Sequence, residues 1–183
     1  MEQQLRLAGV IKESIVDGPG LRYVIFVQGC PHHCPGCHNP TTHPMEGGDI
    51  YPLSKVYDSI CENPLISGVT FSGGEPFCQP EALAILGQLL RSKGLNIMTY
   101  TGYTLEKLLE LRVQRPGIGD LLDTTDWLVD GPFLLEQRSL DLKFRGSRNQ
   151  RIIDMAHFRA TGEIREADLV GQYASEYVCP RTL

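Results

Sequence analysis

The stretch Tyr23-Val24-Ile25-Phe26-Val27-Gln28-Gly29-Cys30-Pro31-His32-His33-Cys34-Pro35-Gly36-Cys37-His38-Asn39 joins an apolar run to three closely spaced cysteines. Its first six residues are mostly β-branched or aromatic and end at a glycine, which is typical of a short buried strand. The cysteines follow with the spacing C-x3-C-x2-C, in the loop directly after that strand. The sequence therefore predicts a strand whose carboxyl end delivers three thiolates.

Further short apolar runs alternate with helical patterns along the rest of the chain. The runs predicted as strands are Gly68 to Ser72, Leu95 to Tyr100, Trp127 to Asp130 and Arg151 to Ile153, and the predicted helices are Leu53 to Cys61, Glu81 to Lys93 and Thr104 to Val113. This alternation predicts an α/β fold with a parallel sheet and right-handed crossovers. A complete eight-unit barrel needs about 250 residues. The 183 residues therefore predict an incomplete TIM-like barrel with parallel strands, forming a single domain over residues 1–183.

The overall charge and the chain's N-terminus limit its partners and its location. The net charge is -5, so no global basic field is available to hold a phosphate backbone, and we expect no direct nucleic acid partner. No basic, apolar leader and no run of about 20 apolar residues is present, so we expect no membrane span and a cytoplasmic location. Cysteines in that compartment are more often metal ligands or free thiols than disulfides.

The cysteine triplet favours an iron–sulfur cluster. Soft thiolates suit iron–sulfur clusters, zinc or copper(I), and a cubane with four protein ligands needs a fourth cysteine. Cys61, Cys78 and Cys179 are scattered and do not repeat the spacing. We therefore predict one 4Fe-4S cluster on Cys30, Cys34 and Cys37, with one iron open to a small molecule. A structural zinc site that combines some of these cysteines with His32, His33, His38 or His43 remains an alternative, as does a role of Cys78 near the cluster.

A second motif, Ser72-Gly73-Gly74-Glu75-Pro76, follows the next predicted strand. With this motif and the cysteine spacing, the chain resembles the radical S-adenosylmethionine (SAM) enzymes. The resemblance implies that the open iron binds the amino and carboxylate groups of SAM. It also implies the residues that contact SAM, which are Gly36, Cys37, His38, Gly73, Gly74, Glu75, Thr99 and Thr101. The chain departs from the superfamily pattern at Gly36, where an aromatic residue is frequent, and His38 follows the cluster instead.

Four further blocks make the chain most similar to the glycyl-radical-enzyme activases, and among them to those of anaerobic (class III) ribonucleotide reductase. They are Val16-Asp17-Gly18-Pro19-Gly20-Leu21-Arg22, Thr99-Tyr100-Thr101-Gly102-Tyr103, Leu128-Val129-Asp130-Gly131-Pro132-Phe133 and Phe144-Arg145-Gly146-Ser147-Arg148-Asn149-Gln150-Arg151. The resemblance implies reductive cleavage of SAM, a glycyl radical on the large reductase subunit as protein substrate, and a low-potential electron donor such as flavodoxin. It runs from about residue 15 to residue 154, and the tail 155–183 carries no recognisable motif.

The remaining alternatives concern single residues and neighbouring families. Asp17 and Asp130 are expected to contact the partner peptide, although a tight turn around Asp17 and a helix cap by Asp130 are equally good explanations. Arg145, Arg148 and Arg151 also fit an ordinary solvated face. The rival functions are the activase of another glycyl radical enzyme of the pyruvate formate-lyase type, 7-carboxy-7-deazaguanine synthase, and a non-enzymatic zinc or iron–sulfur module.

Overall fold

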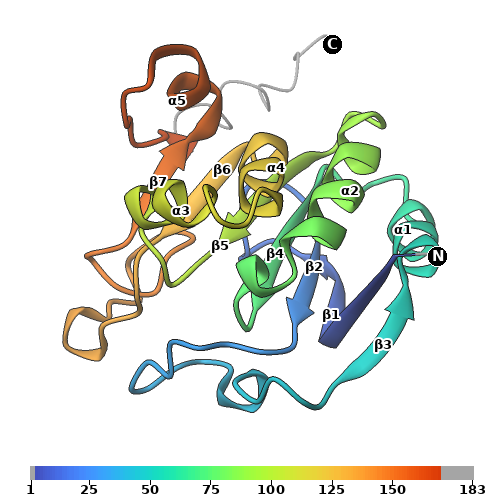
Figure 1. Ribbon diagram of the computed structural model, residues 1–183, viewed down its shortest axis with the longest axis horizontal. Helices are drawn as coiled ribbons and strands as arrows, with labels where there is room; N and C mark the ends of the chain where they lie inside the picture. Colours follow the sequence, from blue (N-terminus) through green and yellow to red (C-terminus); the bar gives the residue numbers. More distant parts are fainter. Residues whose placement is uncertain (1–2, 170–183) are drawn as a thin grey trace, which may run out of the picture.

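A computed structural model describes residues 3–169, whose strands join in one mixed sheet (Figure 1). The strands lie in the order β3-β1-β2-β4-β5-β6-β7. They are β1 (Gln4–Ser14), β2 (Arg22–Val27), β3 (Asp49–Pro52), β4 (Gly68–Gly73), β5 (Asn96–Tyr100), β6 (Trp127–Asp130) and β7 (Arg151–Asp154). The neighbours β2, β4, β5 and β6 run parallel, whereas β1, β3 and β7 are joined antiparallel to their neighbours. The carboxyl ends of the four parallel strands therefore meet at one edge of the sheet.

The helices pack on one face of this sheet. They are α1 (Leu53–Cys61), α2 (Pro80–Arg91), α3 (Leu105–Leu111), α4 (Gly117–Thr124) and α5 (Met155–Thr161). Their buried side chains share one apolar cluster with alternate strand residues such as Ile25, Phe71 and Ile97. The intervening residues Met98 and Val129 belong to a second cluster on the opposite face. Because side chains alternate between the two faces of a strand, the opposite face of the central strands is left free of helices.

Local signals explain where several helices begin and end. Pro80 occupies the first turn of α2, where its missing N–H costs no hydrogen bond. The Thr104 hydroxyl caps α3 by accepting from the Lys107 N–H, and the Asp154 carboxylate caps α5 by accepting from the His157 N–H. Gly162 ends α5 in the left-handed conformation that glycine adopts readily.

All the predicted strands and helices are found within two residues of their expected bounds. The expectation of parallel strands is wrong for β7, which runs antiparallel to β6. Only a short 3-10 helix, Leu135–Gln137, lies between these two strands, and an antiparallel pair does not need the crossover that a parallel pair requires. The sequence did not predict β1, β3, α4 or α5. Residues Gly9–Glu13 of β1 are exposed, so this part of the strand lacks the alternating apolar pattern of a half-buried strand.

The tail predicted without a motif is partly described. After α5, the chain returns alongside β7, where the Ala167 N–H donates to the Ile152 carbonyl. Cys179 and the other residues beyond Leu169 lie outside the described residues. Within residues 3–169, no helix is long and apolar enough to cross a lipid bilayer.

Candidate active site

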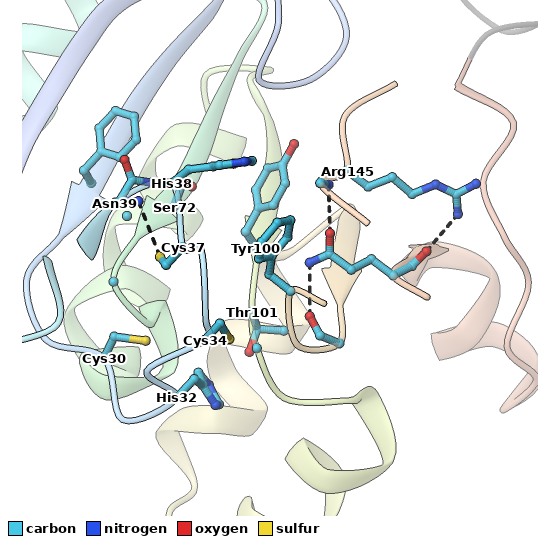
Figure 2. A pocket seen from close by; sticks show the side chains of 18 of the residues that line it. Cys30, His32, Cys34, Cys37, His38, Asn39, Ser72, Tyr100, Thr101 and Arg145 are labelled. Atoms are coloured by element: carbon cyan, nitrogen blue, oxygen red, sulfur yellow. Dashed lines mark hydrogen bonds between the residues drawn. The ribbon is translucent and has the colours of Figure 1, made fainter. Parts of the chain in front are cut away.

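A cavity of about 450 Å³ lies at the carboxyl edge of the parallel strands. Phe26, Ser72 and Tyr100, which come from β2, β4 and β5, line it on the face opposite the helices. Figure 2 shows the cysteine loop on one side of this space and Tyr100, Thr101 and Arg145 on the other. The volume lies within the roughly 300–1,000 Å³ that is usual for small-molecule sites.

Hydrogen bonds at the end of β2 join the beginning and the end of the cysteine loop. The Gly29 N–H donates to the Thr42 carbonyl over 2.8 Å, and the Cys30 N–H donates to the His43 carbonyl over 3.0 Å. Gln28 adds a side-chain bond, since its Nε2 donates to the Pro44 carbonyl over 2.7 Å. These bonds fix both ends of the loop to the end of β2, so its three cysteines lie on one anchored loop.

The three cysteines of this loop are free thiols that line the cavity. Burial raises the pKa of the Cys30 thiol, and the nearby Glu75 and Cys34 raise it further. A bound metal centre reverses this tendency, because a coordinating thiol is deprotonated. Three soft sulfur donors facing one cavity therefore fit an iron–sulfur cluster, which is held by cysteine thiolates.

Cys78 lies apart from the cavity lining, although it is near enough to Cys30 to interact with it electrostatically. Burial, with Glu75 and Cys30 adding to it, raises the pKa of the Cys78 thiol to about 11. At neutral pH this side chain is therefore a neutral thiol. Partly buried free cysteines of this kind commonly behave as small apolar residues.

Gly73 and Gly74 line the cavity where β4 ends, as expected from the second motif. Gly73 has a φ of +92°, and a β-carbon there would lie 2.5 Å from the Phe26 Cα. A β-carbon on Gly74 would lie 2.3 Å from the Gly29 carbonyl oxygen. Glycine is required at both positions because the end of β4 packs directly against the end of β2. This contact brings the second motif against the base of the cysteine loop.

Glu75, the fourth residue of that motif, is fully buried and does not line the cavity. One oxygen, Oε2, accepts hydrogen bonds from His32 Nε2, Thr101 Oγ1 and the Gly102 N–H. The other oxygen, Oε1, accepts from the Phe77 N–H. The carboxylate therefore joins the cysteine loop to the ends of β4 and β5, and the direct contact of Glu75 with SAM stays a prediction.

Two other residues expected at SAM also lie outside the cavity lining. The Thr99 hydroxyl is 2.9 Å from that of Thr125, in the core beneath the helices. Strand alternation explains this, since Tyr100 is the β5 residue that faces the cavity. Gly36 has a φ of +71°, and a β-carbon there would meet Leu135. Gly36 therefore allows the cysteine loop to approach the segment 131–150.

The two aspartates expected at the partner peptide have different positions. Asp17 lines the cavity, and the Ser14 hydroxyl donates to its carboxylate. Asp130 is buried and accepts from the Leu105 N–H at the start of α3, while Arg151 binds both of its oxygens. The alternative that Asp130 is a helix-capping residue thus agrees with the structure, and its contact with a partner peptide stays a prediction.

The structure brings together seven of the predicted cofactor and metal residues, which are Cys30, Cys34, Cys37, His38, Gly73, Gly74 and Thr101. His38 packs against Phe133, with ring centroids 5.0 Å apart. Tyr100, Phe133 and Phe144 were not predicted to line the cavity. Strand alternation would have identified Tyr100, whereas the two phenylalanines lie on a long segment whose path has no local signal in the sequence.

Comparison with known proteins assigns the chain to a family. The family model described as "4Fe-4S single cluster domain" matches residues 16–153. The anaerobic ribonucleoside-triphosphate reductase-activating protein of Escherichia coli (strain K12) is 35% identical over 148 residues, which cover 75% of this chain and 90% of that protein. The protein of the same name from Enterobacteria phage T4 is 32% identical over 76% of this chain and 87% of its own length. This chain belongs to the family of anaerobic ribonucleoside-triphosphate reductase-activating proteins.

This activating-protein family was the one predicted from the motifs, so the prediction is confirmed. The pyruvate formate-lyase-activating enzyme of Clostridium pasteurianum is also similar, at 38% identity over 50% of this chain and 40% of that enzyme. Among solved structures, QueE from Escherichia coli matches with a TM-score of 0.44 and 21% identity over 55% of this chain and 54% of that one, too weak a likeness to establish a shared fold. The family description names a single 4Fe-4S cluster, in agreement with the predicted cofactor.

Proposed function

We propose that this chain is a radical SAM activase that generates a glycyl radical on the large subunit of anaerobic ribonucleotide reductase. One observation carries the proposal. The three thiols of a C-x3-C-x2-C loop and the glycine pair at the end of β4 line the same cavity at the carboxyl edge of a parallel sheet. In parallel α/β folds, this edge is where functional groups collect.

The cysteines and the strand ends have separate tasks in this proposal. Cys30, Cys34 and Cys37 would hold the 4Fe-4S cluster, and Gly73, Gly74, Thr101 and His38 would border SAM. A cluster held there would supply the single electron for reductive cleavage of SAM, the chemistry by which a hydrogen atom would be removed from a glycine Cα of the partner. The chain itself supplies binding, orientation and exclusion of water.

Two hydroxyl groups at the cavity are held by hydrogen bonds within the protein. The Tyr100 hydroxyl, which is at the cavity, donates to the Phe144 carbonyl over 2.7 Å. The Thr101 hydroxyl donates to Glu75. These bonds orient the phenol and the hydroxyl toward protein acceptors, which leaves the apolar ring surfaces of Phe26, Phe133 and Phe144 among the cavity walls.

The sheet supports the expectation of an incomplete TIM-like barrel in a single domain. Four parallel strands carry helices on one face only, and the other face holds the cavity. An open barrel edge suits a substrate that is a segment of another protein. We further infer a cytoplasmic location and a low-potential electron donor such as flavodoxin, because free thiols and a reducible cluster require a reducing environment.

The test is anaerobic reconstitution with iron and sulfide, followed by incubation with SAM, a strong reductant and purified candidate glycyl radical enzymes. We expect 5'-deoxyadenosine, and a glycyl radical signal in electron paramagnetic resonance with the anaerobic reductase subunit. A signal only with a pyruvate formate-lyase-type partner would assign the chain to that substrate instead. Protein that binds zinc and no iron, or never cleaves SAM, would end the proposal.

A further inference from the structure

The segment 131–150, which joins β6 to β7, forms one wall of the cavity and carries a projecting hairpin. Arg138 forms an antiparallel bridge with Ser147, and the Arg148 N–H donates to the Gln137 carbonyl over 3.0 Å. Gln150 secures the base of the segment, since its Oε1 accepts from the Gly146 N–H and its Nε2 donates to the Gly131 carbonyl. In Figure 1 the hairpin is the orange loop that extends from the lower left of the sheet.

The two parts of this hairpin differ in what they face. Leu142, Phe144 and Arg145 line the cavity. Leu140, two residues before the first of these, is 89% exposed. A single exposed leucine is ordinary on a protein surface. The charged residues around Leu140 distinguish it from such a residue.

Three cations surround Leu140 in the hairpin sequence, and their side chains form no ion pair with any residue between 3 and 169. They are Arg138, Lys143 and Arg148. Arg145, by contrast, is held by the Gln150 carbonyl and by Glu166. Asp141 is the one carboxylate in the sequence from residue 138 to residue 148, so the hairpin is positively charged on a chain of net charge -5. A local field of this sign attracts an acidic surface.

The segment before β2 also presents exposed apolar side chains at the cavity. Val16 lines the cavity and is 72% exposed, and its neighbour Ile15 is 74% exposed. A protein substrate whose glycine enters the cavity would therefore meet both Val16 and the hairpin residues that line it. The hairpin tip is continuous with the place where such a substrate has to bind.

We propose that Arg138, Leu140, Lys143 and Arg148, here called the docking tip, bind an acidic surface of the glycyl radical partner beside the segment that carries its glycine. The inference rests on the proposed function and adds the contact that selects the partner. Leu140 is the apolar anchor, which an interface buries at its centre, and the three cations form the charged rim. Charges at a rim chiefly raise the association rate and the specificity.

The experiment compares docking-tip variants with matched controls in the reconstituted enzyme. Leu140→Ala is paired with Leu65→Ala, which changes a leucine that is 75% exposed in the turn before β4, at the far edge of the sheet. The triple variant Arg138→Glu, Lys143→Glu, Arg148→Glu is paired with Lys55→Glu, Lys93→Glu, Arg112→Glu, which makes the same charge change on the helical side. For each protein, we would measure SAM cleavage without partner, the Kd for the reductase subunit at low and high salt, and the yield of glycyl radical.

We expect SAM cleavage without partner to stay within about twofold of wild type in all four variants, because none of the changed residues lines the cavity. Leu140→Ala should weaken partner binding by about tenfold. The triple docking-tip variant should weaken it by at least as much at low salt and lose most of the salt dependence shown by wild type. Both control variants should bind as wild type does.

The outcomes separate the two proposals. If wild type forms a glycyl radical and the docking-tip variants bind like their controls, the docking inference is overturned and the proposed function stands. Loss of partner-independent SAM cleavage in the docking-tip variants would also overturn the inference, since the hairpin would then shape the cavity. If wild type forms no glycyl radical with any candidate, the proposed function itself fails.

Discussion

The Nε2 atom of His32 donates a hydrogen bond of 2.7 Å to the Oε2 atom of Glu75. His32 lies between the first two cysteines of the loop, and Glu75 ends the glycine motif 43 residues later. The imidazole also packs edge-on against Tyr103, with ring centroids 4.4 Å apart. The two sequence motifs that predicted the function are therefore joined physically, through a carboxylate that does not itself face the cavity.

Removing the Glu75 carboxylate should weaken the whole strand-end assembly. Four donors converge on its two buried oxygens, and buried donors left without an acceptor cost about 1–3 kcal/mol each. Glu75→Gln keeps one acceptor oxygen, so we expect the free energy of unfolding to fall by about 2 kcal/mol and the reconstituted protein to lose iron faster to a chelator. Urea denaturation and iron analysis would measure these effects. Glu46→Gln, on an exposed loop, is the control, and equal behaviour of the two variants would refute this role of Glu75.

The cysteines should divide into two groups when each is replaced by alanine. Cys30→Ala, Cys34→Ala and Cys37→Ala each leave two ligands for the cluster, so iron and sulfide content should fall sharply and 5'-deoxyadenosine formation should be abolished. Cys78→Ala should keep its iron, its sulfide and most of its SAM cleavage, because Cys78 does not line the cavity. Iron and sulfide analysis with chromatographic detection of 5'-deoxyadenosine checks both statements. A cluster lost from Cys78→Ala, or full activity in any of the other three, would contradict the assignment.

The sequence predicted the central sheet well because the parallel strands are buried on both faces. Runs such as Tyr23 to Gln28 and Gly68 to Ser72 consist mainly of apolar or β-branched residues. This pattern can be seen in the sequence without knowledge of the tertiary contacts. β1 could not be predicted in the same way. Its residues Gly9–Glu13 are exposed, so its place beside β2 depends on long-range pairing that leaves no local periodicity.

The residues that line the cavity were predicted in part, because only some of them belong to local motifs. The cysteine loop and the glycine pair are local motifs, and the topology brings them together. Thr99 lies outside the cavity lining, because the resemblance pointed to a strand end without specifying which of two alternating faces each residue occupies. Asp130 was ambiguous because its partners, Leu105 and Arg151, are 25 and 21 residues away in sequence. Contacts of that range follow from the fold and not from the neighbouring residues.

The pair of Glu106 and Arg151 should make stability depend on pH in the acid range. Arg151 binds the Glu106 carboxylate through both terminal nitrogens and, chiefly through these hydrogen bonds, lowers the pKa of Glu106 to about 2. A carboxyl whose pKa is lower in the folded state contributes stability above its unfolded pKa of about 4.5, and loses it as the pH falls toward 2.

Glu106→Gln should therefore reduce the loss of stability between about pH 5 and pH 2. The Glu106 side chain is 55% exposed, so solvent screening limits the effect to about 1 kcal/mol or less. Urea denaturation at pH 7, 4 and 3 would measure it, and Lys107→Gln, which breaks a neighbouring exposed pair, controls for surface charge. An unchanged pH profile in Glu106→Gln would show that this ion pair does not contribute.

Among the charged residues of the sheet, we expect Arg22 to be the one whose substitution lowers stability most. Its side chain is fully buried at the start of β2. The guanidinium donates to Thr70 Oγ1, Asn96 Oδ1 and the Val69 carbonyl, and it lies 5.9 Å from the centre of the Trp127 ring. Replacing it leaves several buried acceptors without a donor and opens space beside the loop that carries Asp17.

We expect Arg22→Met to lower the free energy of unfolding by about 2–5 kcal/mol. The stability of Arg22→Lys should lie between those of Arg22→Met and wild type, because one ammonium cannot reach all these acceptors. The denaturation midpoint should shift while the slope stays constant, which marks a change of stability alone. Arg112→Met, at an exposed position after α3, should change stability by no more than about 0.5 kcal/mol.

Because the Thr70 hydroxyl also donates to the Asp17 carbonyl, loosening Arg22 should reduce the glycyl radical yield more than SAM cleavage without partner. If Arg22→Met were as stable as Arg112→Met, Arg22 would not be the residue that anchors this end of the sheet.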